Sequence, residues 1–166
     1  MQPWKNRAVE EANLFNPAFC AALVARASED FSKKSNRPLP FALAFLVLPI
    51  VLHRSTREAL PSSTVTSLLP WIQENKAFLV DFALRVKRLK EITREAILFA
   101  VQQEALAITP TGEIEVGPKR RSATERRTPL FTTEARECVD RAAFIGRWFA
   151  AAGSTATIYS AWGIAP

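Results

Sequence analysis

Apolar positions along the first part of the chain recur at the spacing of a helix. The residues on the shared face are Leu14, Ala18, Ala21, Ala22 and Ala25. This spacing predicts a first helix over residues 8–31, followed by a polar loop over 32–37. An alternative start is Asn16-Pro17, because asparagine caps helices and proline favours the first helical position. The residues before it would then form a docked, extended entry segment.

The most apolar stretch runs from Phe41 to Leu52 and is followed by polar residues as far as Glu58. Pro49 is expected to kink or split this helix, because proline has no backbone N–H to donate. A bilayer needs about 20 apolar residues, so this shorter stretch predicts a core helix and not a membrane anchor. After Pro61, a serine at 62 or 63 is expected to cap a third, short helix that ends at about Glu74.

A longer helical pattern covers residues 77–105, and its apolar register changes near Lys90, where a kink is expected. Residues 105–109, a Pro-Thr-Gly turn and residues 113–116 then alternate apolar and polar positions, which predicts a β-hairpin. Helices followed by a two-stranded hairpin are the layout of a winged helix-turn-helix. We therefore expect a winged-helix-like core over about 38–117.

The last helical pattern, Thr133–Ala152, is the most regular in the chain, and Gly153 suits its C-terminal end. The tail has a strand-like piece at residues 155–160. With 166 residues, of which 48% are hydrophobic, the chain is long enough for one domain with a core. The predicted fold is a single, mainly helical α+β domain. It divides into the winged-helix-like part, a basic loop at 118–129, and a C-terminal helix and tail at 130–166.

Positive charge is concentrated in residues 118–129. Against one acid, Glu125, this segment carries five basic residues, so it supplies +4 of the net charge of +6: Lys119, Arg120, Arg121, Arg126 and Arg127. One interpretation is a solvated loop. The other is contact with DNA phosphates or with an acidic protein surface. A second basic run, Arg85, Lys87, Arg88 and Lys90, lies on the polar side of the long helix, where it is either solvated or faces DNA.

Candidate chemistry for catalysis is scarce. His53 is the only histidine, and no carboxylate lies at helical spacing from it. Cys20 and Cys138 form no metal-binding pattern, and no glycine-rich phosphate loop occurs. We therefore predict no catalytic residues, no metal and no cofactor, although an enzymatic alternative would have to use His53. The N-terminus has no apolar signal region, which leads us to expect a cytoplasmic protein.

The aromatic residues tell more about function than the candidate catalytic residues do. The chain has eleven Phe and four Trp but a single Tyr. Large aromatic side chains near chain ends either hold the terminus down or anchor a partner, because tryptophan and tyrosine are frequent hot spots of interfaces. The residues predicted to contact a partner are Trp4, Phe15, Trp148, Tyr159 and Trp162.

Several long strings also carry a resemblance to a known family. They are EEANLFNPAF (10–19), PFALAFLVLPIVLH (40–53), TREAILFAVQQ (93–103) and RAAFIGRWFAAAGSTATIYSAWGIAP (141–166). In these the chain resembles the middle component of three-component ABC systems, a group that includes Lamassu-type anti-phage defence. The resemblance implies two partner subunits, an SMC/Rad50-like ABC ATPase and an effector such as a nuclease. The basic residues, and not the resemblance, lead us to expect an indirect or weak direct contact with DNA. The resemblance also implies a non-catalytic adaptor; the alternative function is a stand-alone winged-helix DNA-binding regulator.

Overall fold

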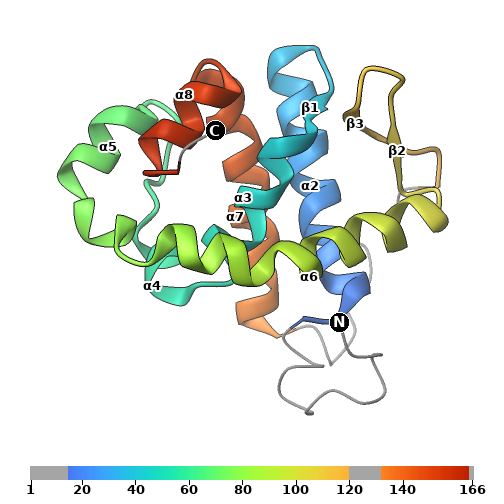
Figure 1. Ribbon diagram of the computed structural model, residues 1–166, viewed down its shortest axis with the longest axis horizontal. Coiled ribbons are helices and arrows are strands. Elements are labelled where there is room, and N and C mark those ends of the chain that lie inside the picture. The colour runs from blue at the N-terminus through green and yellow to red at the C-terminus, as the bar shows by residue number, and fades with distance from the viewer. Residues whose placement is uncertain (1–14, 120–131, 165–166) are drawn as a thin grey trace.

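The computed structural model describes residues 15–119 and 132–164 of the chain. These residues form a mainly helical structure with a small, three-stranded antiparallel sheet at one end (Figure 1). The predicted α+β fold class is therefore confirmed. The division of the chain into parts stays a prediction.

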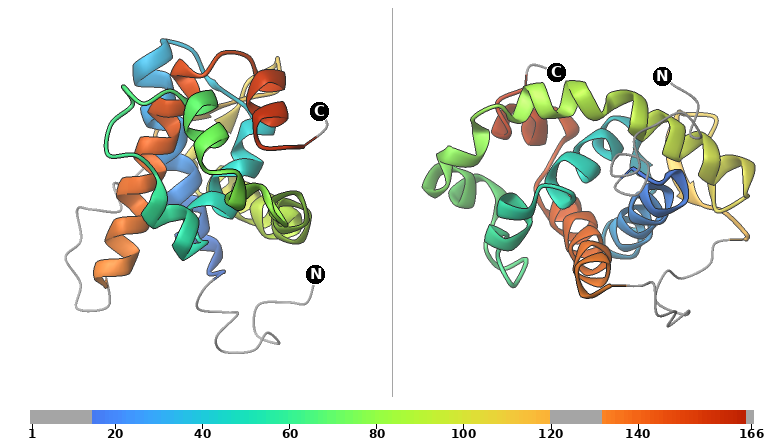
Figure 2. Two further views of the ribbon diagram at one scale, coloured as in Figure 1. Left: turned by 90° about the vertical axis from the view of Figure 1, so that its left-hand side faces the viewer. Right: turned by 90° about the horizontal axis from the view of Figure 1, so that it is seen from below.

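Two long helices, α2 (Pro17–Ser35) and α7 (Thr133–Ala151), form the centre of the fold and pack side by side (Figures 1 and 2). Helix α2 begins at Pro17, and the side chain of Asn16 accepts hydrogen bonds from the backbone N–H groups of Ala18 and Phe19 at 2.9 and 3.3 Å. The alternative start is thus confirmed. Helix α2 runs on to Ser35 and ends with Asn36 in a left-handed conformation, so most of the predicted loop over 32–37 is helical.

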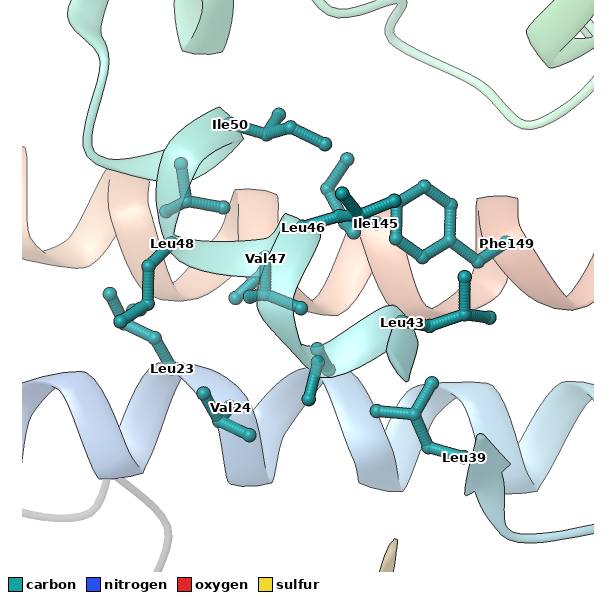
Figure 3. Packing of buried hydrophobic residues seen from close by; sticks show 14 of the residues in the cluster. Leu23, Val24, Leu39, Leu43, Leu46, Val47, Leu48, Ile50, Ile145 and Phe149 are labelled. Atoms are coloured by element: carbon teal, nitrogen blue, oxygen red, sulfur yellow. The ribbon is translucent and has the colours of Figure 1, made fainter. Parts of the chain in front are cut away.

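The apolar helix α3 (Phe41–Val51) lies against both central helices. Figure 3 shows its Leu43, Leu46 and Val47 directed among side chains of α2 and α7. The chain leaves the helix two residues after Pro49, and Leu52 and His53 separate α3 from α4 (Arg54–Ala59), so the predicted split is confirmed. Within the described residues no helix combines the length and apolar character needed to cross a bilayer.

The third helix and the start of the long helix differ from their predictions. Helix α5 (Leu68–Glu74) begins after Ser67, so neither Ser62 nor Ser63 caps it. A short 3-10 helix, η2 (Lys76–Leu79), follows, and the chain then turns at Asp81, which has a φ angle of 58°. The long helix α6 (Phe82–Gln102) therefore starts five residues later than predicted.

Helix α6 runs through Lys90 as one unbroken element, which places the register change within a continuous helix. The change has a tertiary origin. The first half of α6 lies beside α3, where Ala83 and Val86 face Phe41. The second half lies beside α2, where Phe99 and Ala100 face alanines of that helix. Because the two halves of α6 pack against different helices, different positions along α6 have to be apolar.

The predicted hairpin is confirmed as β2 (Leu106–Ile108) and β3 (Glu113–Val116), with Gly112 in the turn at a φ angle of 81°. The two-residue strand β1 (Leu39–Pro40) pairs with the other side of β3, which gives the sheet order β1-β3-β2. The sequence pattern did not reveal β1, because two residues show no alternation.

The tail is the clearest correction. Residues 155–160 were expected to form a strand, but Thr155–Ala161 is a helix, α8. The hydroxyl of Ser154 caps it by accepting from the N–H of Thr157 at 3.1 Å. Threonine and isoleucine favour strands locally, but Ile158 and Trp162, four residues apart, share one buried face. Tertiary burial of that face outweighs the local preference.

Candidate functional site

Helix α6 is the most exposed long element of the described structure and crosses the outside of the molecule (Figure 2). Its inner side is buried on α2 and α3, whereas its outer side carries exposed charged residues. From Phe82 to Lys90 the helix has four basic residues and no acidic one. The first half of α6 therefore presents positive charge, and the only acids of the helix, Glu91 and Glu95, come after it.

A hollow of about 440 Å³ runs along this basic half, between α6, α3 and α8. We call it the α6 groove; its lining residues are Phe41, Ala42, Phe45, Ala83, Val86, Lys87, Lys90, Tyr159 and Ile164. The walls are almost wholly apolar, and the two lysines provide the polar part of the rim. Phe41 is 37% exposed and meets the ring of Phe45 edge-on, at 5.4 Å between ring centroids.

Tyr159 fixes one wall of the α6 groove. Its hydroxyl donates a hydrogen bond to the carbonyl oxygen of Ala42 at 2.7 Å, which joins α8 to α3. Burial raises the pKa of Tyr159 above its ordinary value, which further favours the protonated hydroxyl that donates this bond. The groove is therefore shaped before any partner arrives, a property that lowers the entropic cost of binding.

The four predicted partner residues that the structure describes do not form one surface. Tyr159 lies in the α6 groove, and Phe15 lies half-buried on the other side of α6. Trp148 and Trp162 are each only 1% exposed. Trp4 lies outside the described residues. A partner contact by Trp148 or Trp162 would require the core to open.

Trp148 and Trp162 belong to a cluster of rings inside the protein. Trp71 contacts both of them, at centroid distances of 5.4 and 6.1 Å, and Phe82 stacks on Trp162 at 4.3 Å. The indole N–H of Trp148 donates to the carbonyl of Thr66 at 2.7 Å. These contacts tie α5, α7, the start of α6 and the tail together, which is a structural role.

Sequence reasoning missed Phe41, Phe45 and Val86 as residues that line a groove. Phe41 and Phe45 stand in the most apolar stretch of the chain, which predicts a core helix, and Val86 lies within the apolar pattern of the long helix. A weak signal was present, because Phe41 follows Pro38 and Pro40 at the very start of its helix. Side chains in a first turn often lie at the edge of a core.

The predicted basic segment is placed only at its first residue. Lys119 forms an ion pair with Glu104, with 2.6 Å between Nζ and Oε1. Arg120, Arg121, Arg126 and Arg127 lie outside the described residues. The prediction that this segment binds nucleic acid therefore stays a prediction.

Groups suited to catalysis are not gathered at one place in residues 15–119 and 132–164. No three or more His, Cys, Asp and Glu side chains in these ranges could hold a metal ion together. His53 Nδ1 pairs with the hydroxyls of Thr56 and Ser55, at 2.7 and 3.3 Å. Cys138 is a buried free thiol whose Sγ lies 3.7 Å from the carbonyl oxygen of Val51, and burial raises its pKa.

The comparisons with known proteins give one family. No curated protein and no solved structure matches the chain. The family match spans residues 4–166, which is all of the chain except its first three residues, and it confirms the resemblance to a middle component. The chain therefore belongs to the family described as ABC-three component (ABC-3C) system Middle Component 3.

Proposed function

We propose that the protein is a non-catalytic adaptor subunit of an ABC-three component complex. In this proposal it joins an SMC/Rad50-like ABC ATPase to an effector such as a nuclease, in an anti-phage defence system of the Lamassu type. Its family membership supports a role as one subunit among others. The observation that carries the proposal is the α6 groove, an open apolar surface beside a basic helix face.

Two properties of the α6 groove suit a protein partner. Phe41 is exposed, and Phe45, Val86 and Tyr159 are only partly buried, so the groove keeps accessible apolar surface although the chain has a large core elsewhere. Contiguous accessible apolar surface marks interaction sites. Lys87 and Lys90 border it on α6. A partner helix with an apolar stripe and acidic residues beside it would complement both properties, and the charges would speed association.

The first test is co-expression of the tagged protein with its gene neighbours, followed by mass measurement of the native complex. We expect recovery of an ABC ATPase and an effector. Val86→Glu should reduce the recovered partners about tenfold or more, because it puts an anionic side chain into the apolar wall of the α6 groove.

The matched control for this test is Leu98→Glu. Leu98 lies on the same helix and is 62% exposed, but it does not line the α6 groove. It should leave complex recovery unchanged, and circular dichroism should show both variants folded. Wild-type protein recovered without any ATPase would reject the adaptor role. Equal recovery with both variants would reject the α6 groove as the docking surface.

A second candidate function is DNA binding by the protein alone, as a winged-helix regulator. The observation in its favour is connectivity. Apart from α4, α5 and η2, which are inserted between α3 and α6, the order α2-β1-α3-α6-β2-β3 and the sheet order β1-β3-β2 agree with a winged-helix layout. In that layout α6 would face DNA with Lys87, Arg88 and Lys90, all of which are exposed.

This second candidate predicts salt-dependent binding to duplex DNA. Neutralising Arg120, Arg121, Arg126 and Arg127 to glutamine should lower the slope of log affinity against log salt by about 3 to 4, if each contacts one phosphate. A gel-shift or fluorescence titration at several salt concentrations measures this slope. A variant with Lys34 and Lys76 neutralised controls for lost net charge. No shift of duplex DNA by micromolar protein at low salt would remove this candidate.

A further inference from the structure

A second hollow lies on the opposite side of α6 from the α6 groove. We call it the His53 pocket; it measures about 380 Å³ and is lined by Phe15, Leu52, His53, Arg85, Arg88, Leu89 and Ile92. Its walls are mostly apolar. Two arginines and the only histidine of the chain line the same space, and no acidic residue of the part of the chain that the structure describes lines it.

The guanidinium of Arg85 is poorly neutralised. Its Nη1 donates to two neutral acceptors, the carbonyl oxygen of Pro49 and the hydroxyl of Thr56, both at 3.3 Å. Its charged group also lies 5.6 Å from the centre of the Phe82 ring. Among the described residues no carboxylate lies within ion-pair distance of Arg85. The charge of Asp81 acts on Arg85 from a greater distance. A half-buried cation without a direct ion-pair partner is still costly, and a bound anion would relieve that cost.

The pKa of His53 is affected by the same positive charge. Burial lowers its pKa, and the charge of Arg85 lowers it further. The other charged side chains close by are Arg54 and Glu58, which pair with each other at 2.7 Å, and Arg88 in the pocket wall. Positive charge therefore dominates the side of His53 that faces the pocket.

We propose that the His53 pocket binds a carboxylate that stands next to an apolar side chain, on an acidic segment of a partner subunit. Arg85 and Arg88 supply the donors for the carboxylate, since guanidinium groups pair well with carboxylate oxygens. Leu52, Leu89 and Ile92 supply apolar walls for the neighbouring side chain. A DNA backbone fits this pocket less well, because its phosphates bring no apolar group to fill it.

This inference deepens the proposed function and rests on it only for the source of the segment. With the α6 groove on one side and the His53 pocket on the other, basic residues of α6 border both hollows: Lys87 and Lys90, then Arg85 and Arg88. A partner that straddles the helix would need acidic and apolar residues on both of its contacting edges.

The test uses the isolated protein and phenylpropionate, which carries a carboxylate next to an apolar ring. Since His53 is the only histidine, its ring protons give one unambiguous set of signals in nuclear magnetic resonance spectra. We expect saturable shifts of these signals and a rise in the pKa of His53, because the bound carboxylate offsets the charge of Arg85. The neutral amide, phenylpropionamide, should bind about tenfold more weakly.

Variants assign the effect to the pocket. Arg88→Gln should weaken phenylpropionate binding about fivefold or more. Arg88 is exposed, so this variant should fold even if Arg85→Gln does not. Lys90→Gln is the matched control, because it removes one positive charge from the same helix but borders the other hollow. It should bind phenylpropionate as the wild type does.

Several results would overturn the proposal. If phenylpropionamide bound as tightly as phenylpropionate, the pocket would recognise only the apolar ring and not the carboxylate. Shifts of His53 by inorganic phosphate or a short DNA duplex, without shifts by phenylpropionate, would make it a nucleic-acid contact. If the Arg88→Gln variant lost phenylpropionate binding but still recovered the ATPase and effector at the wild-type level, the His53 pocket would not be a partner site. That last result would leave the adaptor role itself standing.

Discussion

Replacing Gly146 with alanine is expected to lower the free energy of unfolding by about 3 kcal/mol, because α2 and α7 touch at this residue. A Cβ atom at Gly146 would lie 2.1 Å from the carbonyl oxygen of Ala27 and 2.9 Å from the backbone nitrogen of Phe31. Both neighbours are backbone atoms, so no side-chain rotation relieves the overlap. The two central helices would have to move apart.

The change in the free energy of unfolding also includes a stabilising contribution from helix propensity. Alanine favours a helix over glycine by about 1 kcal/mol, so the overlap must cost more than that for the variant to be destabilised. We expect the overlap to cost more than this gain, because α2 and α7 make the most extensive contact in the fold. Moving them apart would loosen the buried layer around Leu23, Ile145 and Phe149 (Figure 3).

Thermal and urea unfolding measure this effect. A loss of about 3 kcal/mol corresponds to a melting temperature lower by about 6–12 °C for a domain of this size. Asp140→Ala is the control, because Asp140 is exposed on the same helix; it should change stability by less than about 0.5 kcal/mol. If Gly146→Ala were as stable as the wild type, the helix contact would have to be looser than the structure shows.

Local signals in the sequence predicted the elements whose ends are set by nearby residues. Asn16 and Pro17 marked the start of α2 because a cap acts over three residues. The regular apolar spacing of 133–152 predicted α7 to within one residue of its end. The hairpin followed from alternation and a turn with glycine. In each case the residues that determine the element lie within the element or a few residues from its end.

Elements that depend on distant contacts were not predictable in this way. The tail forms a helix because Ile158 and Trp162 are buried, with Trp162 stacked on Phe82. Strand β1 exists because Leu39 reaches Ile114, far along the chain. Neither the aromatic cluster nor the α6 groove has a sequence signature, since each combines side chains from several elements that only the folded chain brings together.

Arg57 is a third case of a long-range contact that the sequence hides. It stands among polar residues after the apolar helix, yet it is only 2% exposed. Its Nη1 donates to the carbonyl oxygen of Val51 at 3.0 Å, and its Nη2 donates to Glu134 at 2.8 Å. Its Nε lies 3.3 Å from a carboxylate oxygen of Glu137. One side chain thus links the end of α3, helix α4 and the first turn of α7.

Arg57→Ala should therefore lower the free energy of unfolding by about 2 to 4 kcal/mol. The substitution leaves a cavity and removes the guanidinium donor from the buried carbonyl of Val51. The cost should stay below the extreme for buried ion pairs, because Glu134 and Glu137 are 63% and 37% exposed and water can solvate them. Urea unfolding, with the slope checked against the wild type, measures the change.

Arg54→Ala separates this role from a general effect of charge. Arg54 lies on the same short helix, and its side chain pairs with Glu58 but is 76% exposed. An exposed pair of this kind contributes between 0 and about 1 kcal/mol. Equal losses from both variants would show that the buried contacts of Arg57 add nothing. A several-fold larger loss for Arg57→Ala would instead show that α4 is held to α7 through one cation, which keeps the two helices in register beside the His53 pocket.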